Sequence, residues 1–192
     1  MFRKLLVVGL VLLFSSSLVL GQGSAPSKPK ISVGFLLGTN GGFGGELQGM
    51  VSNLTPDMPF SLRFAFGYNK LEPGISADAR RIFINDATNG VPEEKGYKYD
   101  YKFDLVAPFK FLSFENSFLY GGFRYTKFVA NFKYIGGNDD FDVRSNQWGF
   151  GSGLETYFSV SPKFDLLLTT GLDYMQESDL QGHDTSYSPD GI

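Results

Sequence analysis

Residues 60–69 read FSLRFAFGYN, and this stretch decides the fold. Every second residue in it is large and apolar or aromatic, and the residues between them are Ser61, Arg63, Ala65, Gly67 and Asn69. A period of two over ten residues is typical of a β-strand with one apolar face and one face of small or polar side chains. The stretch therefore predicts a strand rather than a helix.

The same alternation recurs on both sides of this strand. Further alternating stretches occupy residues 31–38, 43–51, 97–105, 117–134, 147–158 and 164–174. Together they predict an all-β, antiparallel up-and-down chain with seven visible strands. The phase slips near Lys127, which predicts a β-bulge there. Residues 71–96 are predicted to form a long polar loop.

The composition narrows the class of protein. The 192 residues include 20 Phe, 10 Tyr, 24 Gly and no Cys, and the formal net charge is -3. The absence of Cys excludes disulfides, thiolate metal sites and cysteine nucleophiles. A negative net charge argues against a nucleic-acid partner, which would need a basic field.

The amino terminus has the pattern of an export signal. Arg3 and Lys4 precede an apolar run at residues 5–14, and small residues follow it. This pattern predicts a cleaved secretory signal peptide at residues 1–21. We then expect a flexible lead at residues 22–30 and a β-barrel domain at residues 31–178.

The second face of the strands predicts which side contacts lipid. A soluble sandwich or lipocalin also buries one face of each strand, so the apolar face alone does not decide. Here the second face is rich in glycine and carries few charges, which suits the interior of a narrow membrane barrel. The charges predicted to form an interior network that plugs the barrel are Glu46, Arg63, Arg124, Glu155 and Asp173.

One segment resembles a known family. Residues 147–174, QWGFGSGLETYFSVSPKFDLLLTTGLDY, resemble the Gly-rich strand, Ser-Pro-Lys turn and following strand of small OmpA/OmpX-like outer-membrane β-barrels, and residues 60–71 fit an earlier strand. The resemblance implies a monomeric transmembrane barrel of about eight strands in the bacterial outer membrane. It also implies contact with outer-membrane lipid and lipopolysaccharide, and insertion by the barrel-assembly machinery. Residues 179–192 are polar, so we expect the eighth strand to be missing and this tail to be a truncated external loop.

Few residues suggest chemistry. Arg80, Arg81 and Phe83 in the long loop form a possible external contact for a surface protein or anionic lipopolysaccharide. His183, beside Asp184 and Ser186, fits a solvated loop better than a catalytic group. The acidic residues 138–142 likewise fit a solvated loop better than a calcium site. We therefore predict no cofactor, no metal site and no enzymatic activity.

The predicted function is an outer-membrane β-barrel with a structural or surface-interaction role and a plugged interior. Three alternatives stay open. They are a narrow channel or carrier for small solutes, an outer-membrane lipid-modifying enzyme, and a soluble secreted lipocalin-like binding protein.

Overall fold

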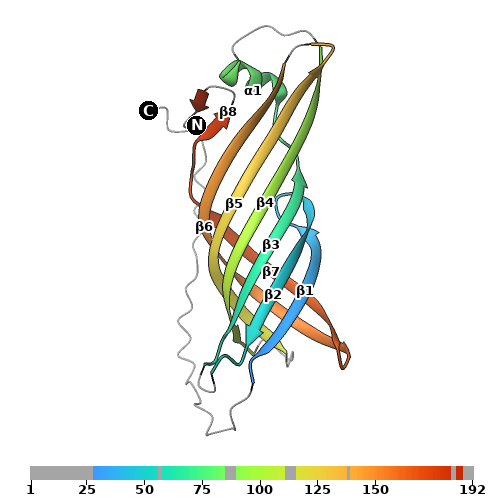
Figure 1. Cartoon of the computed structure of the whole chain (residues 1–192), viewed down its shortest axis with the longest axis vertical. Helices are drawn as coiled ribbons and strands as arrows, with labels where there is room; N and C mark the ends of the chain where they lie inside the picture. The colour runs from blue at the N-terminus through green and yellow to red at the C-terminus, as the bar shows by residue number, and fades with distance from the viewer. Residues whose placement is uncertain are drawn as a thin grey trace.

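The computed structural model describes residues 28–55, 58–84, 90–110, 116–137, 139–182 and 185–187. The strands in these ranges are β1 (Lys30–Thr39), β2 (Phe43–Ser52), β3 (Ser61–Leu71), β4 (Val91–Pro108), β5 (Ser117–Ile135), β6 (Asp140–Ser161), β7 (Phe164–Met175), β8 (Leu180–Gly182) and β9 (Thr185–Tyr187). The one helix among them is α1 (Ser76–Phe83). Figure 1 shows the strands inclined to the long axis and curving around a common interior, with α1 near one end. The predicted signal peptide lies outside the described residues.

All the strands pair antiparallel in one sheet. β1 to β6 follow one another in sequence order, and β6 pairs with β7 at residues 149–161 and with β8 at Val143 and Arg144. Gly149 pairs with Met175, and Val143 pairs with Gly182. Between these two pairs the chain advances six residues along β6 but seven residues from β7 to β8. β7 and β8 are thus two parts of one strand, and the segment that joins them has one residue more than the part of β6 opposite it. β9 is then the eighth strand of the sheet.

This topology confirms the all-β, up-and-down fold and corrects one detail of it. The tail predicted as a loop contains β8 and β9, which pair with each other as a hairpin. The sheet is not closed, because no pairing joins β1 to β7 in the described part of the chain.

The two faces of each strand are reversed relative to a soluble protein. On β3, Arg63 and Asn69 are buried, whereas Phe64 and Phe66 are 57% and 38% exposed. The same reversal holds around the sheet, where exposed side chains include Val33, Phe35, Leu47, Phe103, Phe123, Trp148, Phe150, Leu166 and Leu172. A continuous apolar exterior of this extent requires an apolar surrounding such as lipid.

The long loop predicted at residues 71–96 is shorter than expected and contains a helix. α1 lies within it, and β4 begins at Val91 instead of residue 97. The helix has only eight residues, too few for an apolar stripe to stand out from the sequence. Ile75 at its start provides no side-chain cap, and the Glu94 carboxylate instead accepts a hydrogen bond from the Ser76 N–H at 3.2 Å.

The predicted bulge at Lys127 is wrong. β5 pairs with both neighbours from end to end without a break in register. What changes is the chemistry of its inner face, which is polar at Arg124 and Thr126 and apolar at Phe132 and Tyr134. These two aromatic residues belong to a cluster with Phe83, Ala130, Phe141 and Val143 that packs α1 against the sheet. The phase slip therefore marks a change of environment along a regular strand.

Candidate functional site

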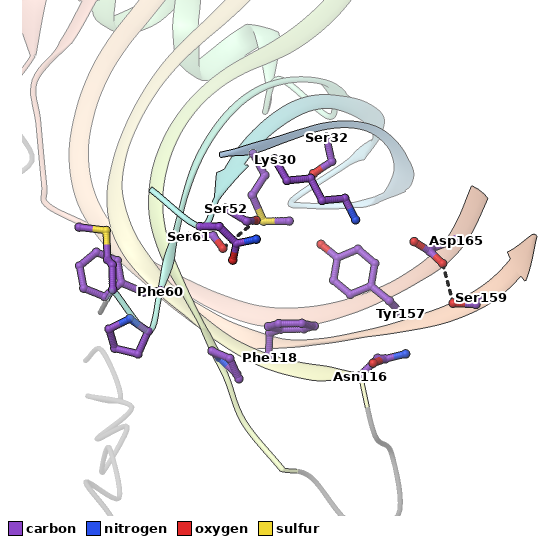
Figure 2. Close-up of a pocket in the computed structure, with 15 residues that line it drawn as sticks. Lys30, Ser32, Ser52, Phe60, Ser61, Asn116, Phe118, Tyr157, Ser159 and Asp165 are labelled. Atoms are coloured by element: carbon purple, nitrogen blue, oxygen red, sulfur yellow. Dashed lines mark hydrogen bonds between the residues drawn. The ribbon is translucent and has the colours of Figure 1, made fainter. Parts of the chain in front are cut away.

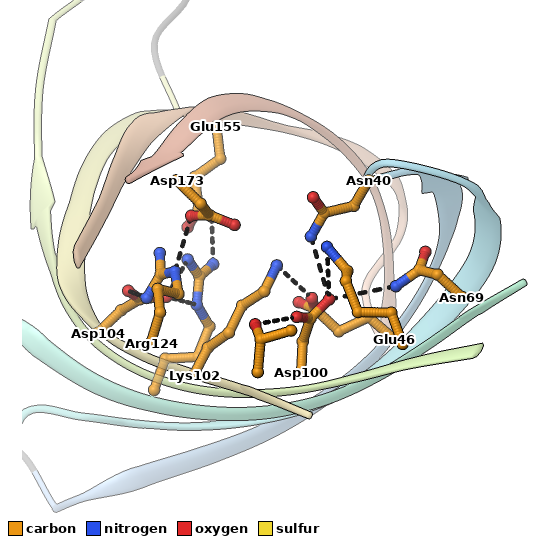
Figure 3. Close-up of polar contacts among 12 residues, drawn as sticks. Asn40, Glu46, Asn69, Asp100, Lys102, Asp104, Arg124, Glu155 and Asp173 are labelled. Atoms are coloured by element: carbon orange, nitrogen blue, oxygen red, sulfur yellow. Dashed lines mark hydrogen bonds and ion pairs between the residues drawn. The ribbon is translucent and has the colours of Figure 1, made fainter. Parts of the chain in front are cut away.

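Five charged side chains of alternating sign form a chain through the interior. In order they are Glu155 (β6), Arg63 (β3), Asp104 (β4), Arg124 (β5) and Asp173 (β7). Arg63 donates to Glu155 and to Asp104, the latter at 2.9 Å from Nη2 and 3.2 Å from Nε. Arg124 donates to Asp104 at 2.5 Å and to Asp173 at 2.8 Å. Because its members come from five strands, this chain ties distant parts of the sheet together (Figure 3).

A second cluster lies beside the first and toward the α1 end. Lys102 pairs with Glu46 at 2.7 Å, and Lys98 pairs with Asp100 at 3.2 Å. Asp100 also accepts hydrogen bonds from Asn40, Asn69 and Thr126, at 3.2, 3.2 and 2.5 Å. Figure 3 shows these side chains directed into the space enclosed by the strands.

The structure brings all five predicted interior charges into these two clusters. It adds four that sequence reasoning did not single out, namely Lys98, Asp100, Lys102 and Asp104. The signal was present in residues 97–105, where lysine and aspartate alternate on the face opposite the tyrosines. The sequence showed the face on which these charges lie but not their partners, because the partners stand on other strands.

Burial makes these pairs structurally important. Arg124, Glu155, Asp100 and Asp104 are each at most 2% exposed. A buried charge is costly unless opposite charges and hydrogen bonds satisfy it, and each of these has at least two partners. The nine charged groups comprise four cations and five carboxylates, so the interior is close to neutral. The arrangement fills the interior of a narrow barrel with ion pairs.

Gly151 on β6 makes room for the first chain of charges. A Cβ atom at this position would lie 2.0 Å from Asp173 Oδ1 and 2.5 Å from Arg124 Nε. We expect Gly151→Ala to displace this ion pair and to lower the free energy of unfolding by about 1–3 kcal/mol. Urea unfolding in detergent micelles measures the change. The matched control is Gly49→Ala on β2, where no atom lies within 4 Å of the new methyl group, and equal losses in both variants would contradict the prediction.

The other end of the barrel contains a cavity of about 510 Å³. Its lining combines apolar side chains such as Met50, Phe60 and Phe118 with polar ones, and Figure 2 shows Tyr157 pointing into it. Five of the polar lining side chains have partners, as Ser52 bonds to Ser61, Ser159 to Asp165, and the Tyr157 hydroxyl to Glu155. The cavity therefore provides space but no evident reactive group. Sequence reasoning did not anticipate it.

The predicted external contact is only partly on the surface. Arg81 on α1 is exposed and pairs with Asp78 at 3.3 Å, and the Arg80 guanidinium lies 5.6 Å from the centre of the Tyr134 ring. Phe83 is only 5% exposed because it packs in the cluster beneath the helix. Phe83 is therefore not available as an external contact, which corrects that part of the prediction.

The remaining candidates do not form a reactive site in the described chain. Asp140 and Asp142 accept hydrogen bonds from Asn131 at 3.0 and 2.9 Å, and Arg144 pairs with Asp142 at 2.7 Å. Partial burial raises the pKa of Asp142, but the hydrogen bonds from Arg144 and Asn131 outweigh it and leave this pKa below its usual value. Among the described residues, no group of three or more His, Asp or Glu could hold a metal ion. His183, Asp184 and Asn138 lie outside those residues.

An exposed aromatic exterior around an ion-paired interior defines the architecture of an outer-membrane β-barrel. The solved structure of a major outer membrane protein from Thermus thermophilus is similar, with a TM-score of 0.66 and 23% sequence identity over 86% of this chain and 82% of that chain. No protein-family model matches the sequence. No curated protein matches it either. In the described part of the chain, no helix is long and apolar enough to span a membrane. The structural likeness shows that the chain has an outer-membrane β-barrel fold.

Proposed function

We propose that this protein is an outer-membrane β-barrel of the small OmpA/OmpX-like kind with a structural or surface-interaction role. The observation that carries the proposal is the chain of ion pairs that crosses the interior from Glu155 to Asp173. An interior occupied by paired charges leaves no open path for solutes. The likeness to the Thermus protein supports the outer membrane as the location.

Connection lengths orient the barrel. At one end the connections are residues 53–60, 109–116 and 162–163, whereas the α1 end has short connections at residues 40–42 and 136–139 and the long one from β3 to β4 at residues 72–90. Outer-membrane barrels have short periplasmic turns and longer external loops. We therefore place α1 outside the cell. Export through the predicted signal peptide and insertion by the barrel-assembly machinery belong to the same proposal.

The external part is larger than loops alone. β4, β5 and β6 have 18, 19 and 22 residues, and about 9–11 tilted residues suffice to cross a bilayer. These strands therefore extend beyond the membrane and carry α1 on their inner face. On this helix Arg81 and Ile82 are exposed, which offers a surface for a protein or anionic lipopolysaccharide.

Cold and heated gel electrophoresis of the full chain tests the proposal. After expression and fractionation, we expect material that needs detergent for extraction and changes mobility when heated. A soluble product without such a shift would support the lipocalin-like alternative. Ion conductance in planar bilayers would support the channel, and alteration of outer-membrane lipids upon expression would support the enzyme.

The docking of α1 makes a separate prediction. We expect Phe83→Ala to release the helix, because a buried aromatic side chain contributes about 3–5 kcal/mol to packing. Limited trypsin digestion should then cut faster after Arg80 and Arg81, while the heat-dependent mobility of the barrel persists. Ile75→Ala, at a residue that is 67% exposed, serves as the control and should leave the cutting rate unchanged. Unchanged cutting in Phe83→Ala would show that the cluster does not hold the helix.

A further inference from the structure

The outward face of β3 to β6 changes chemistry over three successive rungs, where a rung is a set of residues paired side by side across the strands. The first rung is Phe66, Tyr101, Tyr125 and Trp148. Its members contact one another, with ring centroids 5.2 Å apart for Phe66 and Tyr101 and 4.4 Å for Tyr125 and Trp148. A continuous aromatic row on the lipid-facing side marks the membrane interface.

Cations appear directly beyond this row. The second rung, toward α1, is Tyr68, Tyr99, Lys127 and Asn146, and the third is Lys70, Tyr97, Val129 and Arg144. Tyr68 stacks with Tyr97 and Tyr99 at 5.9 and 5.4 Å between centroids. Tyr97 and Tyr99 on β4 therefore lie between Lys70 on β3 and Lys127 on β5, and Tyr68 stands beside Lys70 on β3.

Lys70 and Lys127 are available to a ligand because of their exposure and their place beside the aromatic row. Both are exposed, and within the described ranges neither has an ion-pair partner, whereas the interior lysines Lys98 and Lys102 are paired. Two strand spacings, about 10 Å, separate their strands. Arg144 lies on the next strand, β6, but forms an ion pair with Asp142 at 2.7 Å. The face thus presents two available cations flanking a polar aromatic surface.

The depth of these lysines indicates their ligand. Groups just beyond an interfacial aromatic row lie at the level of lipid headgroups, where each basic residue contributes about 1 kcal/mol of attraction to anionic lipid. Tyrosine hydroxyls at the same level add hydrogen-bond donors for phosphate oxygens.

We propose that Lys70 and Lys127, with Tyr97 and Tyr99 between them and Tyr68 beside Lys70, bind the phosphate of an anionic lipid headgroup at the α1 end of the barrel. This site rests on the proposed membrane location but assigns a ligand and residues that the location alone does not give. The ligand is the headgroup of a membrane lipid, not free phosphate. Such binding would enrich anionic lipid around the barrel at the membrane interface near α1.

Trp148 provides the measurement. It is the one tryptophan of the chain and stands on the first rung, two residues along β6 from Asn146, the partner of Lys127. Brominated lipids quench tryptophan fluorescence on contact. The full chain is reconstituted in phosphatidylcholine vesicles containing brominated phosphatidic acid, and quenching is compared with that by brominated phosphatidylcholine. We expect the protein to prefer phosphatidic acid about tenfold, and this preference should fall in 0.5 M salt.

The variant Lys70→Gln/Lys127→Gln should lose most of this preference. Lys133→Gln/Lys163→Gln, which removes the same charge from β5 six residues beyond Lys127 and from the β6–β7 turn, is the matched control and should keep it. Equal preference in the double variant and the wild type, or no preference in the wild type, would overturn the site. Suppression of the preference by millimolar inorganic phosphate would show that the ligand is free phosphate and would also overturn it.

The same samples separate this proposal from the proposed function. If the wild-type protein inserts and shifts mobility on heating but shows no lipid preference, only the proposed lipid site is contradicted. Wild-type protein that neither inserts nor shifts contradicts the membrane barrel and the site together.

Discussion

Replacing Arg63 with alanine should destabilise the barrel by about 3–5 kcal/mol. Arg63 is 5% exposed, donates to both Asp104 and Glu155, and lies 4.6 Å from the centre of the Tyr120 ring. Asp104 would keep Arg124, but Glu155 would retain only the Tyr157 hydroxyl while still buried. Urea unfolding in micelles, followed by Trp148 fluorescence, and the temperature of the gel-mobility shift both measure the loss.

Two further variants show whether the loss comes from a buried charge. Arg144→Ala removes an arginine whose side chain is 57% exposed, and it should change stability by at most about 1 kcal/mol. Arg63→Met/Glu155→Gln removes both charges of one pair and should be more stable than Arg63→Ala, because no carboxylate remains unpaired. If all three variants unfold alike, the interior chain does not stabilise the fold.

The second large effect is expected on the outer face. Phe150 on β6 is 58% exposed and packs against Phe123 at 5.3 Å between ring centroids. Phe150→Arg should cost about 2–4 kcal/mol, because it places a charge in hydrocarbon. The readout is the fraction of protein that folds into vesicles, together with the unfolding midpoint of the folded fraction.

Asn146→Arg is the matched control for this change. Asn146 lies on the same face of β6, four residues closer to α1 and beyond the aromatic row. Its replacement should be tolerated, since an arginine at this level reaches water or headgroups. A soluble lipocalin-like barrel predicts the opposite outcome for Phe150→Arg, because an arginine replacing an exposed phenylalanine in water would change stability by only about 0.5 kcal/mol.

The repeated alternation in the sequence was sufficient to predict the fold and the faces of the strands. Glycine and scattered charges on one face of every strand predicted where Arg63, Arg124 and Glu155 would point, since a period of two assigns each side chain to a face. The same pattern carries no information about which strand supplies the partner of each charge, so Asp104 as the bridge between two arginines was not predicted.

The wrong prediction of a bulge at Lys127 and the missed helix α1 have a common physical cause. At the outer ends of β4 to β6 the surroundings of the strand change from lipid to water outside and from ion pairs to α1 inside. Apolar residues there move to the inner face, so Phe132 and Tyr134 appeared out of phase although the backbone is regular. α1 was missed because tertiary packing against these aromatics, more than its own eight residues, stabilises it.

The ion pair between Arg63 and Glu155 joins residues that are 92 positions apart in the sequence. Until both strands have reached their places, Glu155 would carry its charge into hydrocarbon without a cation, whereas Arg63 already has Asp104 on the neighbouring strand β4. β6 therefore cannot enter the bilayer first and wait for β3, because its glutamate would have no counter-charge during the interval. We therefore expect the insertion of β6 to be coupled to its assembly with β3, a contact between distant parts of the sequence of the kind that forms slowly.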